Sequence, residues 1–166
     1  MVEVRLTAVR VDVPSANPVV LLQELGGARS LPIFIAPDGA TAIAYALQGV
    51  EVPRPMTHDL LKDVVEALGA QVVRVIVTEL RDATYYAEIE FAAGEQHLRV
   101  SSRPSDAIAL ALRTDSPLFV EDALMAEAGV IVELDDDEET DEEGSELLVG
   151  EFREFLDSVK PEDFSG

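Results

Sequence analysis

The sequence AIAYAL at residues 42–47 returns almost unchanged as AIALAL at residues 107–112. Each copy is rich in alanine and leucine, which favour helix, and each follows three segments whose apolar residues alternate as in strands. A second helix-like segment follows each copy. The same order of elements in both halves predicts an α+β fold with a mainly antiparallel sheet. We interpret it as an internal duplication of a three-strand, two-helix unit, with repeats at about residues 1–70 and 71–132.

In the first half, three strands are expected before two helices. The strands are VEVRLTAVRVDV, VVLLQEL and RSLPIFI, the last two joined by a Gly26–Gly27 turn. The first helix is ATAIAYALQG, ended by Gly49, and the second covers residues 55–68 up to Gly69. Helical spacing places a run of apolar residues on the buried stripe of the second helix: Leu60, Leu61, Val64, Val65 and Leu68.

In the second half, strands are expected at QVVRVIVTEL, YYAEIEF and EQHLRVSS, followed by the helix SDAIALALR and a short helix near residue 121. If Ala93–Gly94 forms a two-residue turn, Glu90 faces His97 and Glu88 faces Arg99 across the strands. The other face of this pair then joins Ile89 to Leu98 and Ala87 to Val100. This pairing gives His97 a structural role, which argues against a catalytic one.

Charge divides the chain into a modestly charged body and a strongly acidic tail. The net charge is −21, and residues 133–166 hold 15 of the 33 acidic residues but only two of the 12 basic ones. We therefore expect a folded domain at residues 1–134, an acidic linker at 135–144 and a C-terminal helix and tail at 145–166. The apolar stripe of that helix docks on its own domain or on a protein partner, and docking on its own domain is favoured.

The composition excludes several classes of protein. The absence of cysteine excludes disulfides and thiolate zinc sites. The chain has no apolar run of membrane-spanning length and no signal-peptide pattern, so a soluble cytoplasmic protein without membrane contact is expected. The acidic surface repels polyanions on average, so a nucleic-acid role would depend on a local basic cluster, a bound cation or both.

Two Arg-Pro corners stand before helices, RPMTHDLL at residues 54–61 and RPSDAIALAL at residues 103–112. As plain helix starts, Pro keeps the preceding Arg extended, Thr57 and Ser105 cap free N–H groups, and Asp59 and Asp106 favour the helix dipole. Capping requires neither Arg54 nor Arg103, and it does not require His58. Extended arginines beside helix N-termini also suit an oxyanion or phosphate, so both interpretations stay open.

These corners, together with YYAEIEF at residues 85–91, resemble the bifunctional nuclease family, whose domain is abbreviated BFN. The resemblance covers about residues 2–134, and RPMTHDLL and SRPSDAIALALR are its specific part. It implies a duplicated α+β fold and activity on both RNA and DNA, which would be the substrates.

Under the nuclease interpretation, His58 serves as general acid or base, with Asp59 and Glu79 as further catalytic candidates. A Mg²⁺ or Mn²⁺ ion bound by carboxylates of Asp59, Asp106 or Glu79 would lower the pKa of water and offset the acidic surface. Arg54, Thr57, Arg103 and Ser105 would bind the phosphate. Each role has a structural alternative: the two aspartates as caps, His58 bonded to a neighbouring backbone group, and Glu79 solvated beside a turn.

Two other functions compete with a nuclease of low sequence specificity. One is a non-catalytic regulatory or protein-interaction module that holds an anionic ligand at the Arg-Pro corners. The other is a sensor of a phosphate-bearing small molecule that uses the same groups. Edge strands and an exposed apolar helix also permit a homo-oligomer.

Overall fold

The computed structural model describes residues 1–12 and 15–131, and this part forms one α+β unit. Its strands are β1 (Val2–Asp12), β2 (Asn17–Glu24), β3 (Arg29–Phe34), β4 (Ala70–Arg81), β5 (Thr84–Ala93), β6 (Gln96–Ser102), β7 (Leu118–Val120) and β8 (Val130–Ile131). Its helices are α1 (Pro37–Leu47), α2 (Thr57–Ala67), α3 (Pro104–Thr114) and α4 (Asp122–Ala128). The predicted acidic linker and C-terminal helix lie outside the described residues.

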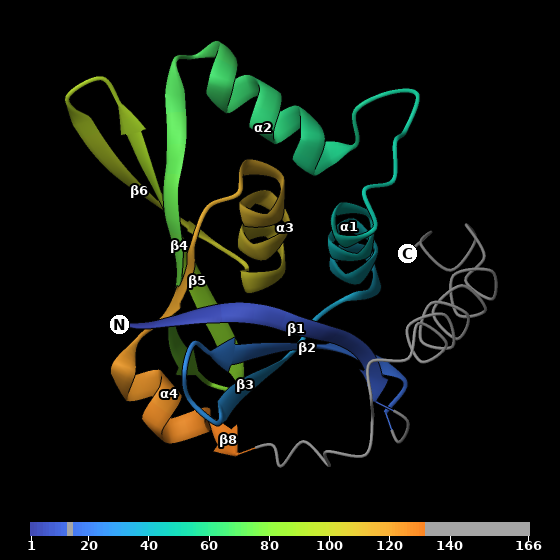
Figure 1. The fold of residues 1–166 in the computed structure, drawn as a ribbon, viewed down its shortest axis with the longest axis vertical. Coiled ribbons are helices and arrows are strands. Elements are labelled where there is room, and N and C mark those ends of the chain that lie inside the picture. Colours follow the sequence, from blue (N-terminus) through green and yellow to red (C-terminus); the bar gives the residue numbers. More distant parts are fainter. Residues whose placement is uncertain (13–14, 132–166) are drawn as a thin grey trace. The chain divides into compact units, whose positions relative to one another are not determined.

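All eight strands join one mainly antiparallel sheet in the order β6-β5-β4-β7-β1-β2-β3-β8 (Figure 1). Two three-stranded meanders, β1–β3 and β4–β6, are the two halves of this sheet. The short strand β7 lies between them and pairs antiparallel with β1 and parallel with β4. At the far edge, β8 pairs with β3. The α+β class and the antiparallel character of the sheet are therefore confirmed.

Both halves contain three strands followed by helices, in the predicted order, but the second half adds β7 and β8. These short strands were not predicted, because three and two residues are too few to show alternation. The internal duplication itself stays a prediction.

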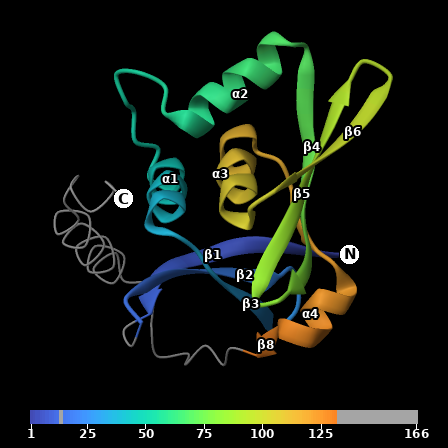
Figure 2. The same ribbon diagram turned by 180° about the vertical axis from the view of Figure 1, so that it is seen from behind.

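Helix α3 is the centre of the core. It packs against α1, α2, β4 and β5, and Figures 1 and 2 show it between α1 and the β4–β5 part of the sheet. The segment AIALAL contains no polar side chain, so α3 can bury almost its full circumference. Five of its apolar residues are at most 2% exposed: Ala107, Ile108, Ala109, Leu110 and Ala111. Strand residues such as Leu22, Ile33, Val75 and Ile89 complete this aliphatic core.

Helix α2 departs from the expectation of a buried stripe. It contains no buried residue, and Leu60, Leu61, Val64 and Leu68 are all exposed. The prediction that this stripe faces the core was wrong. Helix α2 contacts α3 through the polar side chains of His58 and Asp59, and its apolar side is exposed to solvent. Within the described residues, no helix has both the length and the apolar character needed to cross a membrane.

The β5–β6 pairing keeps the predicted faces but not the predicted partners. The turn is Gly94–Glu95, one residue later than expected, and Gly94 has a φ of 61° that glycine adopts without strain. Glu90 therefore lies opposite Arg99 and not His97, while His97 lies opposite Ala92. Because the shift in pairing is two residues, each side chain remains on its expected face.

Candidate functional site

The N-terminal turns of α2 and α3 meet and bring His58 to Asp106. His58 Nε2 lies 3.0 Å from Asp106 Oδ1, and the imidazole is only 13% exposed. Arg103 donates to the same carboxylate from Nε, at 2.7 Å, and from Nη2, at 3.0 Å. The Arg103 guanidinium also lies 3.6 Å from Asp38 at the start of α1. We call these four side chains, Asp38, His58, Arg103 and Asp106, the helix-junction cluster.

Proline explains the geometry of the Arg103 corner. Pro104 is the first residue of α3, and the preceding Arg103 is extended with φ −70° and ψ 145°, as a residue before proline must be. Asp106 lies three residues later, in the first helical turn, so its carboxylate meets the Arg103 side chain. The sequence therefore supplies an arginine–aspartate pair at the helix start, and α2 adds the imidazole.

The cluster keeps the Asp106 carboxylate ionised. Burial raises the pKa of Asp106, but hydrogen bonds from Arg103 and His58 more than offset it, so the pKa lies below its usual value. An ionised carboxylate can only accept, so the proton that it shares with His58 belongs to Nε2. Nδ1, the other ring nitrogen, makes no hydrogen bond within the described residues.

A second link between α2 and α3 lies beside the cluster and was missed by the sequence analysis. Arg113, only 9% exposed, donates from Nε to Asp59 and from Nη1 to the carbonyls of Ala42 (3.0 Å) and Ala109 (2.9 Å). One guanidinium thus connects α1, α2 and α3. The hydrogen bond from Arg113 is the main reason that the pKa of Asp59 lies below its ordinary value.

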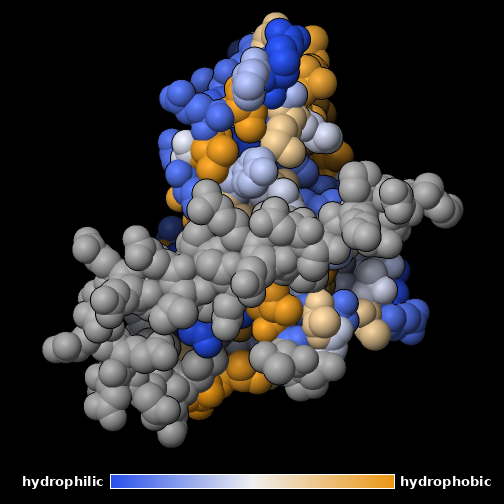
Figure 3. Space-filling view, turned by 90° about the vertical axis from the view of Figure 1, so that its right-hand side faces the viewer, coloured by the Kyte–Doolittle hydropathy of each residue, from blue (hydrophilic) through white to orange (hydrophobic). Residues whose placement is uncertain are grey.

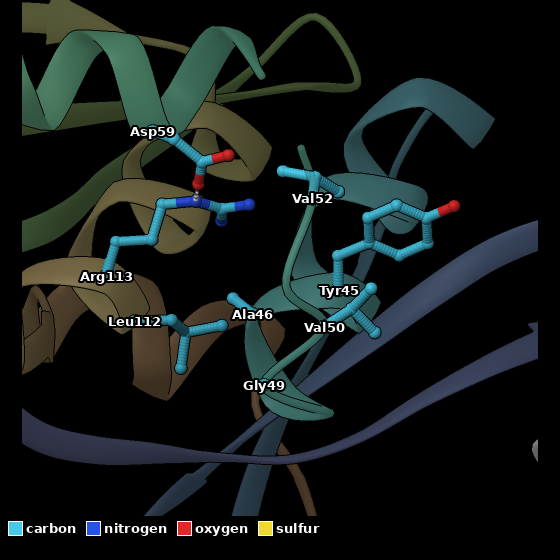
Figure 4. Close-up of a pocket in the computed structure, with 8 residues that line it drawn as sticks. All are labelled: Tyr45, Ala46, Gly49, Val50, Val52, Asp59, Leu112 and Arg113. Carbon is cyan, nitrogen blue, oxygen red and sulfur yellow. Dashed lines mark hydrogen bonds and ion pairs between the residues drawn. The ribbon is translucent and has the colours of Figure 1, made fainter. Parts of the chain in front are cut away.

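The Asp59–Arg113 pair lines a pocket of about 280 Å³ (Figure 4). Its other walls come from the end of α1, the loop after it and α3: Tyr45, Ala46, Gly49, Val50, Val52 and Leu112. In Figure 4 the Arg113 guanidinium points toward the Asp59 carboxylate, while Val52 and the Tyr45 ring lie across from the pair. The charged pair therefore forms one wall of a pocket whose other lining residues are mainly apolar.

Thr57 and Ser105 do not cap the helices, so that interpretation was wrong. The N-cap residues are Met56 and Arg103, and Thr57 and Ser105 already lie inside the helices. Asp59 does accept from the Met56 N–H at 2.9 Å, as the structural alternative expected. Ser105 is 5% exposed and packs against Gly39, where an added Cβ would lie 2.6 Å from the Ser105 Cβ. Its predicted role in substrate binding stays a prediction, as does that of the exposed Thr57.

Two further candidates lie apart from the cluster. Arg54 is exposed in the loop before α2 and makes no ion pair within the described residues, so its guanidinium remains available for a ligand. Glu79 lies near the Asp82–Ala83 turn, opposite Tyr86 on β5, and pairs with Arg81. The structure therefore unites His58, Arg103 and Asp106 but does not bring Glu79 to them.

The carboxylates at the junction do not suit a divalent cation. Asp59 is held by Arg113, and Asp106 by Arg103 and His58, so a guanidinium occupies the place beside each carboxylate. The described ranges 1–12 and 15–131 contain no group of three or more His, Asp or Glu side chains arranged for metal binding. Oxygen ligands in larger number are what Mg²⁺ and Mn²⁺ require. The metal dependence stays a prediction.

The sequence is similar to proteins that include plant bifunctional nucleases. An uncharacterized protein of Mycobacterium tuberculosis is 46% identical over 164 residues, which cover 99% of this chain and 98% of that protein. Bifunctional nuclease 2 of Arabidopsis thaliana is 32% identical over 119 residues, and bifunctional nuclease 1 of Oryza sativa subsp. indica is 30% identical over 107 residues. These matches cover 70% and 63% of this chain, but only 36% and 32% of the plant proteins.

The family model of the bifunctional nuclease domain matches residues 20–133. This range contains α1, α2 and α3 and therefore every member of the helix-junction cluster. It covers more than half of the chain. The protein thus belongs to the bifunctional nuclease family.

Proposed function

We propose that the protein is a nuclease that cleaves RNA or DNA phosphodiester bonds with low sequence specificity, and that the helix-junction cluster is its active site. One observation carries the proposal. A nearly buried imidazole, His58, is oriented by an ionised carboxylate, Asp106, and an exposed guanidinium lies on the same carboxylate. This combination provides a proton acceptor and a phosphate ligand at one place.

Hydrolysis of a phosphodiester requires a deprotonated nucleophile and neutralisation of the phosphate charge. His58 Nδ1 would take a proton from the attacking water while Asp106 stabilises the imidazolium that forms. The P–O bond to the leaving group then breaks, and its oxygen takes a proton from solvent. Asp106 would thus orient the imidazole, and His58 would transfer the proton.

The arginines would supply the positive charge. Arg103 is 60% exposed, and its Nη1 makes no hydrogen bond within the described residues, so this nitrogen can donate to a phosphate oxygen. The exposed Arg54, four residues before His58 in sequence, would provide a second guanidinium. On a chain of net charge −21, such a local pair is required to attract a polyanion.

The test uses the only two histidines of the chain. Purified full-length protein is incubated with labelled RNA and single-stranded DNA, and His58→Gln is compared with His97→Gln, a matched control on the exposed strand β6. We expect His58→Gln to lose about 10²–10⁴-fold in cleavage rate, the usual share of a general base, and His97→Gln to keep the wild-type rate. Equal activity in folded His58→Gln and wild type would refute this active site.

Parallel reactions with Mg²⁺, Mn²⁺ or EDTA test the predicted metal. Cleavage that persists in EDTA supports acid–base chemistry by His58 alone. Cleavage that EDTA abolishes and Mn²⁺ restores supports a metal whose ligands differ from the arginine-bound carboxylates described above. Arg103→Ala separates charge neutralisation from proton transfer, because it should weaken substrate binding as well as turnover.

A non-catalytic module that binds an anionic ligand is the second candidate. The observation in its favour is that Asp59 and Asp106 are already paired with arginines, while Arg54 makes no ion pair within the described residues. Wild-type protein that binds a labelled oligonucleotide without cleaving it, and loses that binding in Arg54→Ala, would support this function over a nuclease.

A further inference from the structure

The apolar side of α2 is a large uncovered hydrophobic surface. Leu68 is 78% exposed, and Leu60, Leu61 and Val64 are exposed too. Helical spacing places these four residues on one side of the helix. Figure 3 shows hydrophobic residues at the surface in the upper part of the molecule, which carries α2 in Figure 1. Monomeric proteins rarely expose a large contiguous apolar patch, so we expect another protein surface to cover this side of α2.

Strand β6 carries a second set of exposed apolar residues, at the edge of the sheet. Leu98 and Val100 are about half exposed, and they lie opposite Phe91 and Ile89 of β5. Directly opposed residues point to the same face, and Phe91 and Ile89 belong to the core side. The apolar side of β6 is therefore on the sheet face that the core helices cover. We call Leu60, Leu61, Val64, Leu68, Leu98 and Val100 the α2–β6 face.

The edge of β6 lacks the features that usually prevent strand pairing. Its sequence QHLRVSS contains no lysine, proline or acidic residue, in a chain with 33 acidic residues. Its one formal charge, Arg99, is neutralised by Glu90 at 2.5 Å and Glu88 at 3.4 Å. Pairing of two copies of β6 therefore brings together no unpaired charge from the strand itself. The opposite edge of the sheet is only the two-residue strand β8.

We propose that the α2–β6 face is a homodimer interface, in which a second copy of this chain pairs edge to edge along β6 and packs its α2 stripe against the first. A twofold axis makes this contact self-complementary, because one strand can pair antiparallel with its own copy. Burying six half-exposed aliphatic side chains removes roughly 400–500 Å² of apolar surface per copy. That is about the apolar share of the ~800 Å² that a standard interface buries on each partner.

The first test is the mass of the full-length protein in solution between about 1 and 100 µM. Sedimentation velocity should give twice the chain mass of 17.9 kDa for the wild type. Leu68→Lys and Val100→Lys change exposed positions, so each should fold, with an unchanged circular dichroism spectrum, and weaken dimerisation at least ~10-fold. Phe34→Lys is the control, because Phe34 is similarly exposed but lies on β3. A wild type that stays monomeric at 100 µM, or a control as disruptive as the other two variants, would overturn the proposal.

Amide hydrogen exchange distinguishes a second copy from another occupant. If a second copy covers the edge, protection of the β6 amides falls on dilution together with the mass. If residues 133–166 of the same chain covered this face, protection would persist in the monomer, and the proposal would be wrong. Leu68→Lys should remove the β6 protection at high concentration, although Leu68 is the C-cap of α2 and not part of β6, because both elements belong to one interface.

Discussion

Replacing Arg113 with methionine should destabilise the folded unit by separating its three central helices. Methionine keeps most of the aliphatic length of arginine but removes every donor. The Asp59 carboxylate then loses its guanidinium, and the Ala42 carbonyl loses a 3.0 Å hydrogen bond. Both carbonyls also lie within helices, Ala42 in α1 and Ala109 in α3, so the Asp59 carboxylate is affected most.

The expected loss follows from the burial of the two partners. Removing one partner of a fully buried ion pair costs about 3–5 kcal/mol. Asp59 is about one-third exposed, so water recovers part of that cost, and we expect a decrease of about 2–4 kcal/mol in the free energy of unfolding at pH 7. For a unit of this size, the decrease corresponds to a Tm lower by roughly 6–12 °C.

The stability difference between wild type and Arg113→Met should depend on pH in a definite direction. Arg113 lowers the pKa of Asp59 in the folded state below its unfolded value of 3.8, so the stabilisation is present above that pH and is lost as pH falls through the folded pKa. The gap between wild type and Arg113→Met should therefore be widest near neutrality and narrow below about pH 4.

The assay is urea unfolding of wild type, Arg113→Met, Asp59→Asn and the double variant, repeated from pH 3 to pH 7. Arg81→Met is the matched control, since the Arg81–Glu79 pair is solvent-exposed and should shift Tm by no more than about 1–2 °C. A double-mutant cycle without coupling between Arg113 and Asp59, or a gap that is constant with pH, would refute the reasoning.

Three further outcomes are expected. Gly39→Ala should lower stability by about 1–3 kcal/mol in thermal melts, because its Cβ would lie 2.6 Å from the Ser105 Cβ, and Ser105→Gly in the same chain should restore it. Ile108→Ala should cost about 2–5 kcal/mol in urea unfolding, since Ile108 is fully buried at the centre of α3; a loss below 1 kcal/mol would contradict that placement. Arg74 lowers the pKa of Glu90 through a hydrogen bond, so Arg74→Met should be less stable than wild type at pH 7 and approach it as pH falls below about 4.5; a gap that widens in acid would show the opposite linkage.

Local patterns predicted most of the elements. Alternation located β1 to β6, and helix signals located α1, α2, α3 and the short α4 near residue 121, because these signals depend on residues within a few positions of one another. The β5–β6 register was wrong because Ala93–Gly94 and Gly94–Glu95 are both acceptable turns in sequence, and only the pairing of the strands decides between them.

The errors in α2 and at Arg113 have a different cause. An amphipathic stripe shows that a helix has an apolar side, but not that its own chain covers that side. Arg113 is a single charge at the end of an apolar helix, which is a signal for a buried pair, but its partner Asp59 is 54 residues away in sequence. Spacing likewise could not show that His58 meets Asp106, whereas it did indicate Arg103 beside Asp106.

The late position of β7 and β8 in the chain has a consequence for biosynthesis. The β1–β3 meander is complete once about the first 34 residues have been made. Its outer neighbours, β7 on β1 and β8 on β3, begin only 84 and 96 residues later. Until then the nascent chain exposes two unsatisfied backbone edges at the ribosome, where holding by chaperones is most useful. A product released after the first half would keep both edges open, so truncated translation products should be cleared or aggregate instead of persisting as folded half-domains.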